Sequence, residues 1–200
     1  MSGAGMSGYA PIRDQFLRFG DLRPQGAGEW RGPFPLPPAL AEFYAEVGPL
    51  GPVVYEHVGP VGVTIPGTAL GFAPLAKLWV RQAGYRWDGN SGERLTDWPE
   101  DWLVIADQHA DPLILEYVHR CVLYALHGAG RWDAQWLAPD LRTLAAVLAS
   151  VGGVHEDAGD DLCDDEGELR PRHREAAVRA AAAVLGGDEA ARAFFDLLEW

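Results

Sequence analysis

The sequence contains little cysteine and little lysine, and it has no long run of apolar residues. Its 2 cysteines, Cys121 and Cys163, are too few for a disulfide framework and form no Cys-x-x-Cys pair, which is typical of a reducing compartment. No apolar segment approaches the roughly 20 residues that cross a bilayer. Residues 1–9 are rich in glycine and serine and lack the basic and apolar profile of a secretory signal. Together these absences predict a cytoplasmic protein.

The usual catalytic motifs are missing as well. No serine lies in a Gly-x-Ser-x-Gly turn, and none of the 6 histidines has the spacing of a His-Glu-x-x-His zinc helix. Residues 3–8 match Gly-x-Gly-x-x-Gly, but no strand precedes them, so they do not predict a dinucleotide site. The sequence therefore predicts a non-enzymatic protein with no catalytic residues, no metal site and no cofactor.

Two polar segments have some features of metal sites. Asp107, His109 and Asp111 can meet at the end of a strand, as metal ligands do, but short polar loops there more commonly hydrogen-bond to backbone N–H groups. The acidic run from Asp161 lacks the spacing of a calcium loop, because Cys163 occupies its third position. We therefore favour a structural role for the first segment and a solvated one for the second.

Acidic residues outnumber basic residues, with 29 Asp and Glu against 16 Lys and Arg, and the formal net charge is −13. Such a surface repels nucleic-acid phosphates and anionic membranes, so neither is an expected partner. It attracts basic proteins and accelerates their association. The apolar content of 48% is enough for a core, and 8 tryptophans supply large contact areas for that core or for an interface.

Composition divides the chain into segments. Residues 1–10 are predicted to be disordered, residues 11–152 to form an α+β domain, residues 153–171 to be an acidic linker, and residues 172–200 to be a C-terminal helical extension. Periodicity, proline and glycine predict helices at 14–22, 37–48, from 74, 139–152, 172–185 and from 188. Short apolar runs predict strands at 53–58, 61–65, 102–106, 112–118 and 121–126, with a turn at His119 and Arg120 between the last two.

The order of these signals between residues 36 and 151 resembles the SUKH superfamily (Smi/Knr type), which includes bacterial immunity proteins and a fungal cell-wall regulator. The similar stretches are 36–44 followed by Gly48, 98–107, 111–115, 122–132 and the helix over 138–151. The most recognisable is 98–107, Trp-Pro-Glu-Asp-Trp-Leu-Val-Ile-Ala-Asp. The chain departs from the family pattern at Ala110, where glycine is usual, at the turn of residues 119–120, and after Gly153, where the pattern ends.

The resemblance implies an α+β fold with a central, mostly antiparallel sheet and flanking helices. It also implies binding rather than turnover, by an immunity protein that neutralises a bacterial toxin domain of the nuclease or deaminase type through a non-covalent interface. The cognate toxin is expected to have a basic active-site cleft. The alternative is a scaffold or regulatory adaptor with no toxin partner, whose C-terminal helices dock a protein through Phe194, Phe195 and Leu198.

Two groups of residues carry the expected roles. Structural roles are predicted for the residues of the family pattern, with the two indoles clamping helix to sheet: Trp98, Pro99, Trp102, Asp107 and Asp111. Partner binding is predicted for acidic and aromatic residues: Asp157, Asp160, Asp161, Asp164, Asp165, Glu166, Glu168, Trp132 and Trp136. An acidic run is more often a solvated tether than a contact, and a tryptophan packs equally well into a core, so these alternatives stay open.

Overall fold

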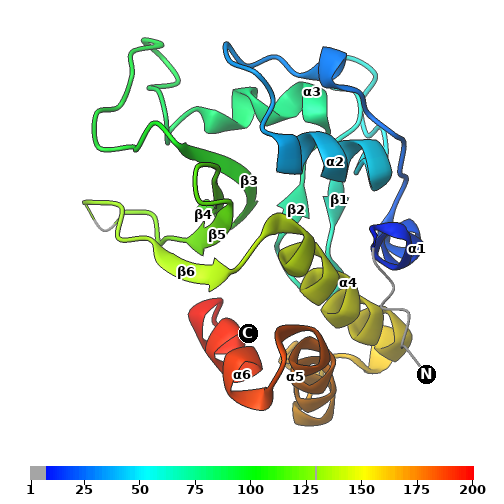
Figure 1. The fold of residues 1–200 in the computed structure, drawn as a ribbon. Helices are drawn as coiled ribbons and strands as arrows, with labels where there is room; N and C mark the ends of the chain where they lie inside the picture. The colour runs from blue at the N-terminus through cyan, green and yellow to red at the C-terminus, as the bar shows by residue number, and fades with distance from the viewer. Residues whose placement is uncertain (1–7, 129) are drawn as a thin grey trace, which may run out of the picture.

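The fold is built on one antiparallel sheet (Figure 1). The computed structural model describes residues 8–128 and 130–200, and within them the chain forms a six-stranded open sheet and six α-helices, an α+β fold. The strands neighbour one another in chain order, and each neighbouring pair is antiparallel. They are β1 (Val63–Thr64), β2 (Gly71–Phe72), β3 (Trp102–Gln108), β4 (Asp111–Glu116), β5 (Cys121–Tyr124) and β6 (Gln135–Ala138).

Proline and glycine set several of the helix ends. The helices are α1 (Ala10–Phe19), α2 (Pro38–Glu46), α3 (Leu75–Leu78), α4 (Leu141–Ala158), α5 (Pro171–Leu185) and α6 (Asp188–Leu197). A proline occupies the first turn of α1, α2 and α5, where its missing N–H costs no hydrogen bond. Asp140 caps α4 by accepting a hydrogen bond from the Thr143 N–H at 2.7 Å, and Gly186 ends α5 in the left-handed conformation.

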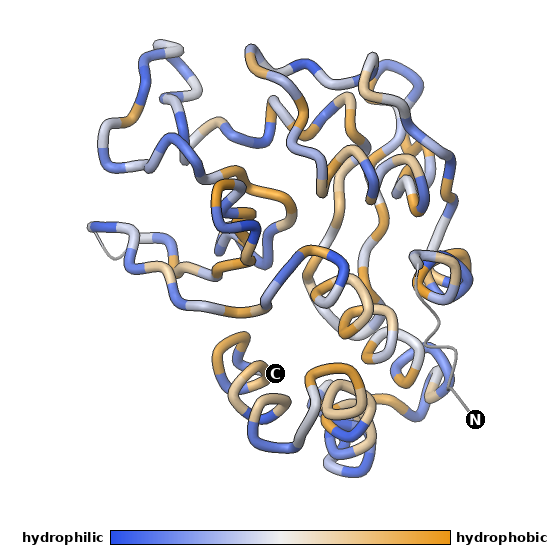
Figure 2. Tube along the Cα trace, viewed as in Figure 1, coloured by the Kyte–Doolittle hydropathy of each residue, from blue (hydrophilic) through white to orange (hydrophobic). Residues whose placement is uncertain are grey.

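Strands β3 and β4 are buried on both faces, which explains their nearly continuous apolar sequences, whereas β5 is buried on one face and partly buried on the other. Leu113 of β4 faces the main core, whereas Ile114 faces a smaller apolar cluster on the other side of the sheet. A bulge between Val104 and Ala106 shifts the register of β3, so Ile105 and Ala106 both join the main core although they are consecutive. Figure 2 shows hydrophobic residues concentrated on these central strands and hydrophilic residues along the outer loops.

The C-terminal helices are part of the main core. In Figure 1, α5 lies beside α4 and α6 lies beside α5. Their buried residues pack with those of α1, α2 and α4: Ala177, Val178, Ala181, Ala191, Phe194, Phe195 and Leu198. The last three are at most 3% exposed, so they are not available to dock a partner as the adaptor hypothesis required.

Several predictions from the sequence are confirmed. Helix α2 ends just before Gly48, whose φ of +61° suits a helix stop. The predicted strand at 102–106 is the first part of β3. Strands β4 and β5 form the predicted hairpin, and Arg120 adopts a φ of +66° in its turn. The central sheet is antiparallel, as expected.

The predicted strand at 53–58 is wrong. Val53 makes only an isolated bridge to Pro60, and every side chain from residue 53 to residue 58 is exposed. The β-branched residues of this segment have no core or extended neighbouring strand to pack against, so their propensity alone does not produce a strand. Of the predicted strand at 61–65, only the two residues of β1 remain, and the sheet also uses β2 and β6, which no sequence signal indicated.

Both ends of the predicted α+β domain differ from expectation. Disorder was predicted up to residue 10, but helix α1 begins at Ala10 and Tyr9 is buried. Residues 1–7 lie outside the described residues. Helix α4 continues past its predicted end at Gly152, so the first part of the predicted linker is helical. A Cβ atom at Gly152 would lie 2.7 Å from the ring of Phe19, which indicates that this glycine permits close packing of α1 on α4.

Candidate functional site

The predicted acidic linker is a folded turn between α4 and α5. We call residues 156–168 the acidic turn. It starts in the last turn of α4, continues through a 3-10 helix (Gly159–Asp161), and closes with a backbone bridge between Cys163 and Leu169. Because the segment is helical at its start and is closed by a backbone bridge at its end, it is part of the fold and not a solvated tether.

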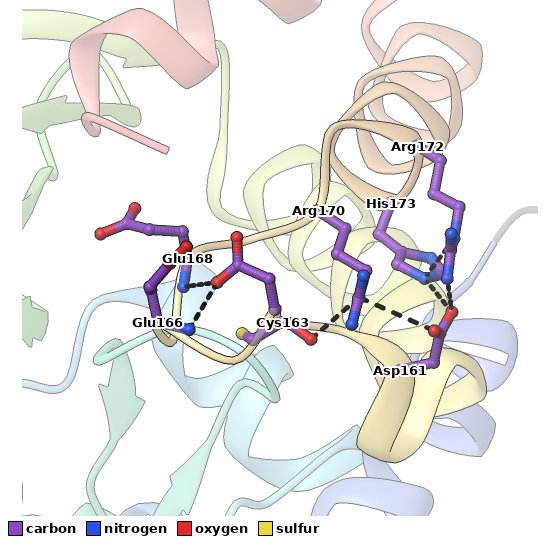
Figure 3. A network of polar contacts seen from close by, with 8 residues as sticks. Asp161, Cys163, Glu166, Glu168, Arg170, Arg172 and His173 are labelled. Atoms are coloured by element: carbon purple, nitrogen blue, oxygen red, sulfur yellow. Dashed lines mark hydrogen bonds and ion pairs between the residues drawn. The ribbon is translucent and has the colours of Figure 1, made fainter.

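Asp161 is the centre of the ion pairs that attach this turn to α5 (Figure 3). Its carboxylate pairs with the Arg172 guanidinium, lies 2.8 Å from His173 Nε2 and lies 3.7 Å from Arg170 Nε. Hydrogen bonds from Arg172 and then His173 lower the pKa of Asp161 to about 2. Asp161 is therefore ionised at neutral pH, and its charge is already compensated within the molecule.

Two further acidic residues of the predicted set also bond within the protein. One carboxylate oxygen of Asp164 accepts the backbone N–H groups of Glu166 at 3.0 Å and Glu168 at 2.9 Å. Asp157, at the end of α4, lies 2.5 Å from a guanidinium nitrogen of Arg18 in α1. The contacts of Asp164 shape the turn and give it a structural role. The pair of Asp157 with Arg18 joins α4 to α1 at the surface, where Asp157 is 71% exposed, so it contributes little free energy.

The remaining predicted acidic residues form the outer side of the acidic turn. Asp160, Asp165, Glu166 and Glu168 are exposed, and their carboxylates make no hydrogen bond or ion pair with any residue of the described chain. Figure 3 shows Glu168 directed away from the Asp161 ion pairs. Four negative charges on a fixed backbone can receive arginine or lysine side chains of a partner.

The predicted tryptophans divide between a buried cluster and the surface. Trp98 is 1% exposed and meets Trp102 and Trp132 edge to face, with ring centroids 5.5 and 5.1 Å away. These rings cover the sheet face opposite the main core and hold a loop against it, not a helix as predicted. The Pro99 carbonyl accepts the Trp102 N–H at 3.3 Å and closes the turn. Trp132 is thus partly buried, whereas Trp136 of β6 is 59% exposed.

Asp107 and Asp111 have different partners and do not form a common site. Asp107 lies 2.7 Å from a guanidinium nitrogen of Arg81. Asp111 accepts hydrogen bonds from the His127 backbone N–H at 2.7 Å and the Tyr124 hydroxyl at 3.2 Å. Partial burial opposes ionisation of Asp111, but these hydrogen bonds outweigh it and hold the pKa of Asp111 below its ordinary value. Both carboxylates therefore make structural contacts.

No motif indicated the buried carboxylate of Glu116. It accepts the N–H groups of Val118 at 3.1 Å and His119 at 2.9 Å, which explains why the turn between β4 and β5 forms without glycine. The available signal was a charged residue that ends an apolar strand just before a turn. Burial of Asp101 and its hydrogen bond to Glu116 raise the pKa of Asp101. Burial and the Glu116 charge raise the pKa of the Cys121 thiol, which makes it a weak nucleophile.

The described residues contain no group of three or more His, Cys, Asp or Glu side chains arranged to hold a metal ion. Among the described helices, none is both long enough and apolar enough to span a membrane.

In comparisons with known proteins, no family model, curated protein or solved structure matches this chain.

Proposed function

We propose that this protein is a SUKH-type immunity protein, which binds a bacterial toxin domain and neutralises it without forming a covalent bond. The ordered stretches 36–44, 98–107, 111–115 and 122–132 support this proposal, because together they resemble that family. The antiparallel sheet with flanking helices is compatible with the fold that the family implies. The observation that carries the function is the acidic turn.

The acidic turn suits a basic partner because its charges are both exposed and held in position. The ion pairs of Asp161 and the hydrogen bonds of Asp164 fix the backbone, while Asp160, Asp165 and Glu166 extend into solvent. A partner that binds here does not have to order a loose tether, so less conformational entropy is lost on binding. The net charge of −13 adds long-range attraction, which raises the association rate.

A nuclease or deaminase domain is the favoured partner, because such enzymes hold nucleic acid through basic groups around the active site. An acidic turn that occupies such a cleft competes with the phosphates and blocks the substrate. This role requires no bond-making by the chain itself. It is therefore expected to act stoichiometrically in the cytoplasm, without turnover.

The test is co-expression of the chain with each toxin domain encoded beside its gene, with bacterial growth as the readout. We expect the wild-type chain to restore growth against one of these domains and to form a stoichiometric complex with it in vitro. The triple variant Asp160→Lys, Asp165→Lys, Glu166→Lys is expected to lose protection, since the carboxylates that face the partner become repulsive. A matched control reverses three exposed acidic residues elsewhere, Asp14, Glu46 and Asp97, and is expected to protect.

Two outcomes would argue against the proposal. Failure of the wild-type chain to protect against any of the toxin domains contradicts the immunity role. Equal loss of protection in the acidic-turn variant and the control variant shows that only the total charge matters, and it contradicts the acidic turn as a contact surface.

A further inference from the structure

The sheet is open at β6, and this edge has no backbone partner among the described residues. Strand β6 pairs with β5 alone, with Gln135 opposite Tyr124 and Ala138 opposite Val122. Unpaired edges are templates for another strand, and proteins usually protect them with short strands, bulges, charged residues, proline or a covering segment. Strand β6 is short, with 4 residues, and its pairing with β5 shifts register between Val122 and Leu123. The sequence of β6, Gln-Trp-Leu-Ala, contains neither a charged residue nor proline.

Large apolar side chains are exposed at this edge and in the β5–β6 connection beside it. Trp136, the second residue of β6, is 59% exposed, and Leu126, just beyond β5, is 51% exposed. Tryptophan is among the residues that contribute most to binding free energy when an interface buries it. Its exposure beside an unpaired edge marks a surface that a partner can cover.

A groove of about 550 Å³ lies beside the start of β6, between the end of the β5–β6 hairpin and α6. Its walls include Tyr124 and Gln135 of the sheet, Leu126 just beyond β5, and Leu197 of α6. Figure 1 shows α6 below β6 in this region. The groove therefore adjoins the start of β6 at Gln135 and has apolar residues on both walls, whereas Trp136 lies outside it.

The charged side chains that line this groove are mostly acidic. Three carboxylates line it, those of Asp133, Asp196 and Glu199, against one guanidinium, that of Arg131. The pairs Arg131–Asp133 and Arg174–Asp196 are both 3.6 Å long, and the two acidic side chains are 79% and 76% exposed. Exposed pairs of this kind contribute little free energy, so they are easily exchanged for a partner's cation.

We propose that β6 and this groove bind an extended segment of the partner, which joins the sheet as an additional strand and places an arginine or lysine among Asp133, Asp196 and Glu199. The expectation that the partner is basic rests on the proposed function. The observation that the edge of β6 is unpaired does not depend on that function. An extended chain satisfies the free backbone groups of β6, and its alternate side chains contact Trp136. A second copy of this chain is disfavoured as the occupant, because it would bring the same carboxylates and another net charge of −13 to the edge.

The first experiment titrates the full isotope-labelled chain with a peptide of about ten alternating arginine and valine residues, long enough for one strand. We expect the backbone amide signals of residues 135–138 and the indole signal of Trp136 to shift. A peptide methylated on alternate backbone nitrogens keeps its charge but loses strand hydrogen bonds, and it is expected to bind much more weakly. Absence of binding, equal binding of both peptides, or shifts confined to the acidic turn would overturn the inference.

Two variants locate the site. Trp136→Lys places a charge on the edge and should abolish peptide binding. The matched control Val80→Lys changes a side chain that is 70% exposed outside the groove and should bind as wild type. The double variant Asp133→Lys, Glu199→Lys should weaken peptide binding at least about tenfold, because attractive charges become repulsive. Binding that is unchanged in Trp136→Lys or in the double variant contradicts the edge site.

The toxin-protection assay separates this inference from the proposed function. If Trp136→Lys still protects cells while the acidic-turn variant does not, the proposed function stands and the edge site is wrong for that partner. If the wild-type chain protects against no toxin domain but the peptide shifts residues 135–138, the proposed function fails and the edge site stands.

Discussion

At the scale of single residues, most of the informative polar groups are bonded inside the protein. Glu116 and Asp164 accept backbone N–H groups, and Asp161 accepts side-chain donors from α5. A carboxylate withdrawn from water costs free energy unless such donors replace the lost hydration. Asp161 is exposed, as are Asp160 and Asp165, but among the described residues only Asp161 has ion-pair partners. Those partners, and not burial, separate its structural role from the proposed binding role of the other two.

His155 predicts a pH-dependent stability. Its side chain is 3% exposed, Nδ1 lies 2.8 Å from the Pro66 carbonyl oxygen, and Nε2 has no hydrogen-bond partner among the described residues. Burial, with a smaller effect of the nearby His173, lowers the pKa of His155 in the folded state. The unfolded chain then takes up a proton at higher pH than the folded chain. The free energy of unfolding should therefore fall as the pH drops below about 6.5.

Urea unfolding of the wild type and of His155→Gln near pH 7.5 and near pH 5.5 measures this effect. Glutamine keeps a donor for the Pro66 carbonyl but does not titrate in this range. The wild type is expected to lose more stability on acidification than the variant. Equal losses would mean that other groups are responsible for the pH dependence.

At the scale of elements, α4 connects the layers of the molecule. It packs against α1, α2, α5 and β6, and its extra length beyond Gly152 brings His155 to Pro66 and Asp157 to Arg18. A pair of glycines is a common sign of a helix end, but here the pair lies inside the helix. The Gly152 contact with α1 is a tertiary requirement that local sequence patterns do not report.

The C-terminal helices predict a large effect of core truncation. Phe195 of α6 is fully buried, so Phe195→Ala should lower the free energy of unfolding by about 3–5 kcal/mol. Arg192→Ala, at an exposed position of the same helix, should change it by less than about 0.5 kcal/mol. Denaturant unfolding followed by fluorescence and circular dichroism measures both. If α6 is instead a separable extension, Phe195→Ala will leave the main transition where it is in the wild type.

At the scale of the whole molecule, net charge and the open sheet edge have complementary effects on binding. The charge of −13 acts over the Debye length and affects how often a basic partner arrives. Strand pairing at β6 and burial of Trp136 act only at contact and affect how long the partner stays. The two proposed surfaces therefore make separable contributions to the rates of binding.

Salt should accordingly change the association rate and the dissociation rate by different amounts. Between about 0.05 M and about 0.5 M ionic strength, the association rate with a toxin domain that the chain neutralises should fall at least about tenfold. The dissociation rate should change far less, because short-range contacts control it. Stopped-flow fluorescence of the tryptophans gives both rates, and an association rate that is independent of salt would contradict electrostatic steering.

The sequence by itself determined the coarse α+β class, helix α2, the central strands β3 to β5 and the acidic character of the surface. These features follow from periodicity and composition over neighbouring residues, which are local properties. Strand β2 escaped prediction because 2 residues are too few to show a period. Strand β6 is as long as β5, but its two exposed residues are followed by two buried ones, so it lacks the alternation of a strand. Segment 53–58 has the composition of a strand but lacks neighbours to bury it.

Only the tertiary structure decided which acidic residues have their charge compensated by a partner within the protein. It also decided that α5 and α6 belong to the core, that Trp98 and Trp132 pack together, and that β6 is an open edge. Each of these depends on contacts between distant parts of the chain, such as Arg18 with Asp157. The free energy of such contacts depends on burial and on the partners present, and neither is encoded in the spacing of neighbouring residues.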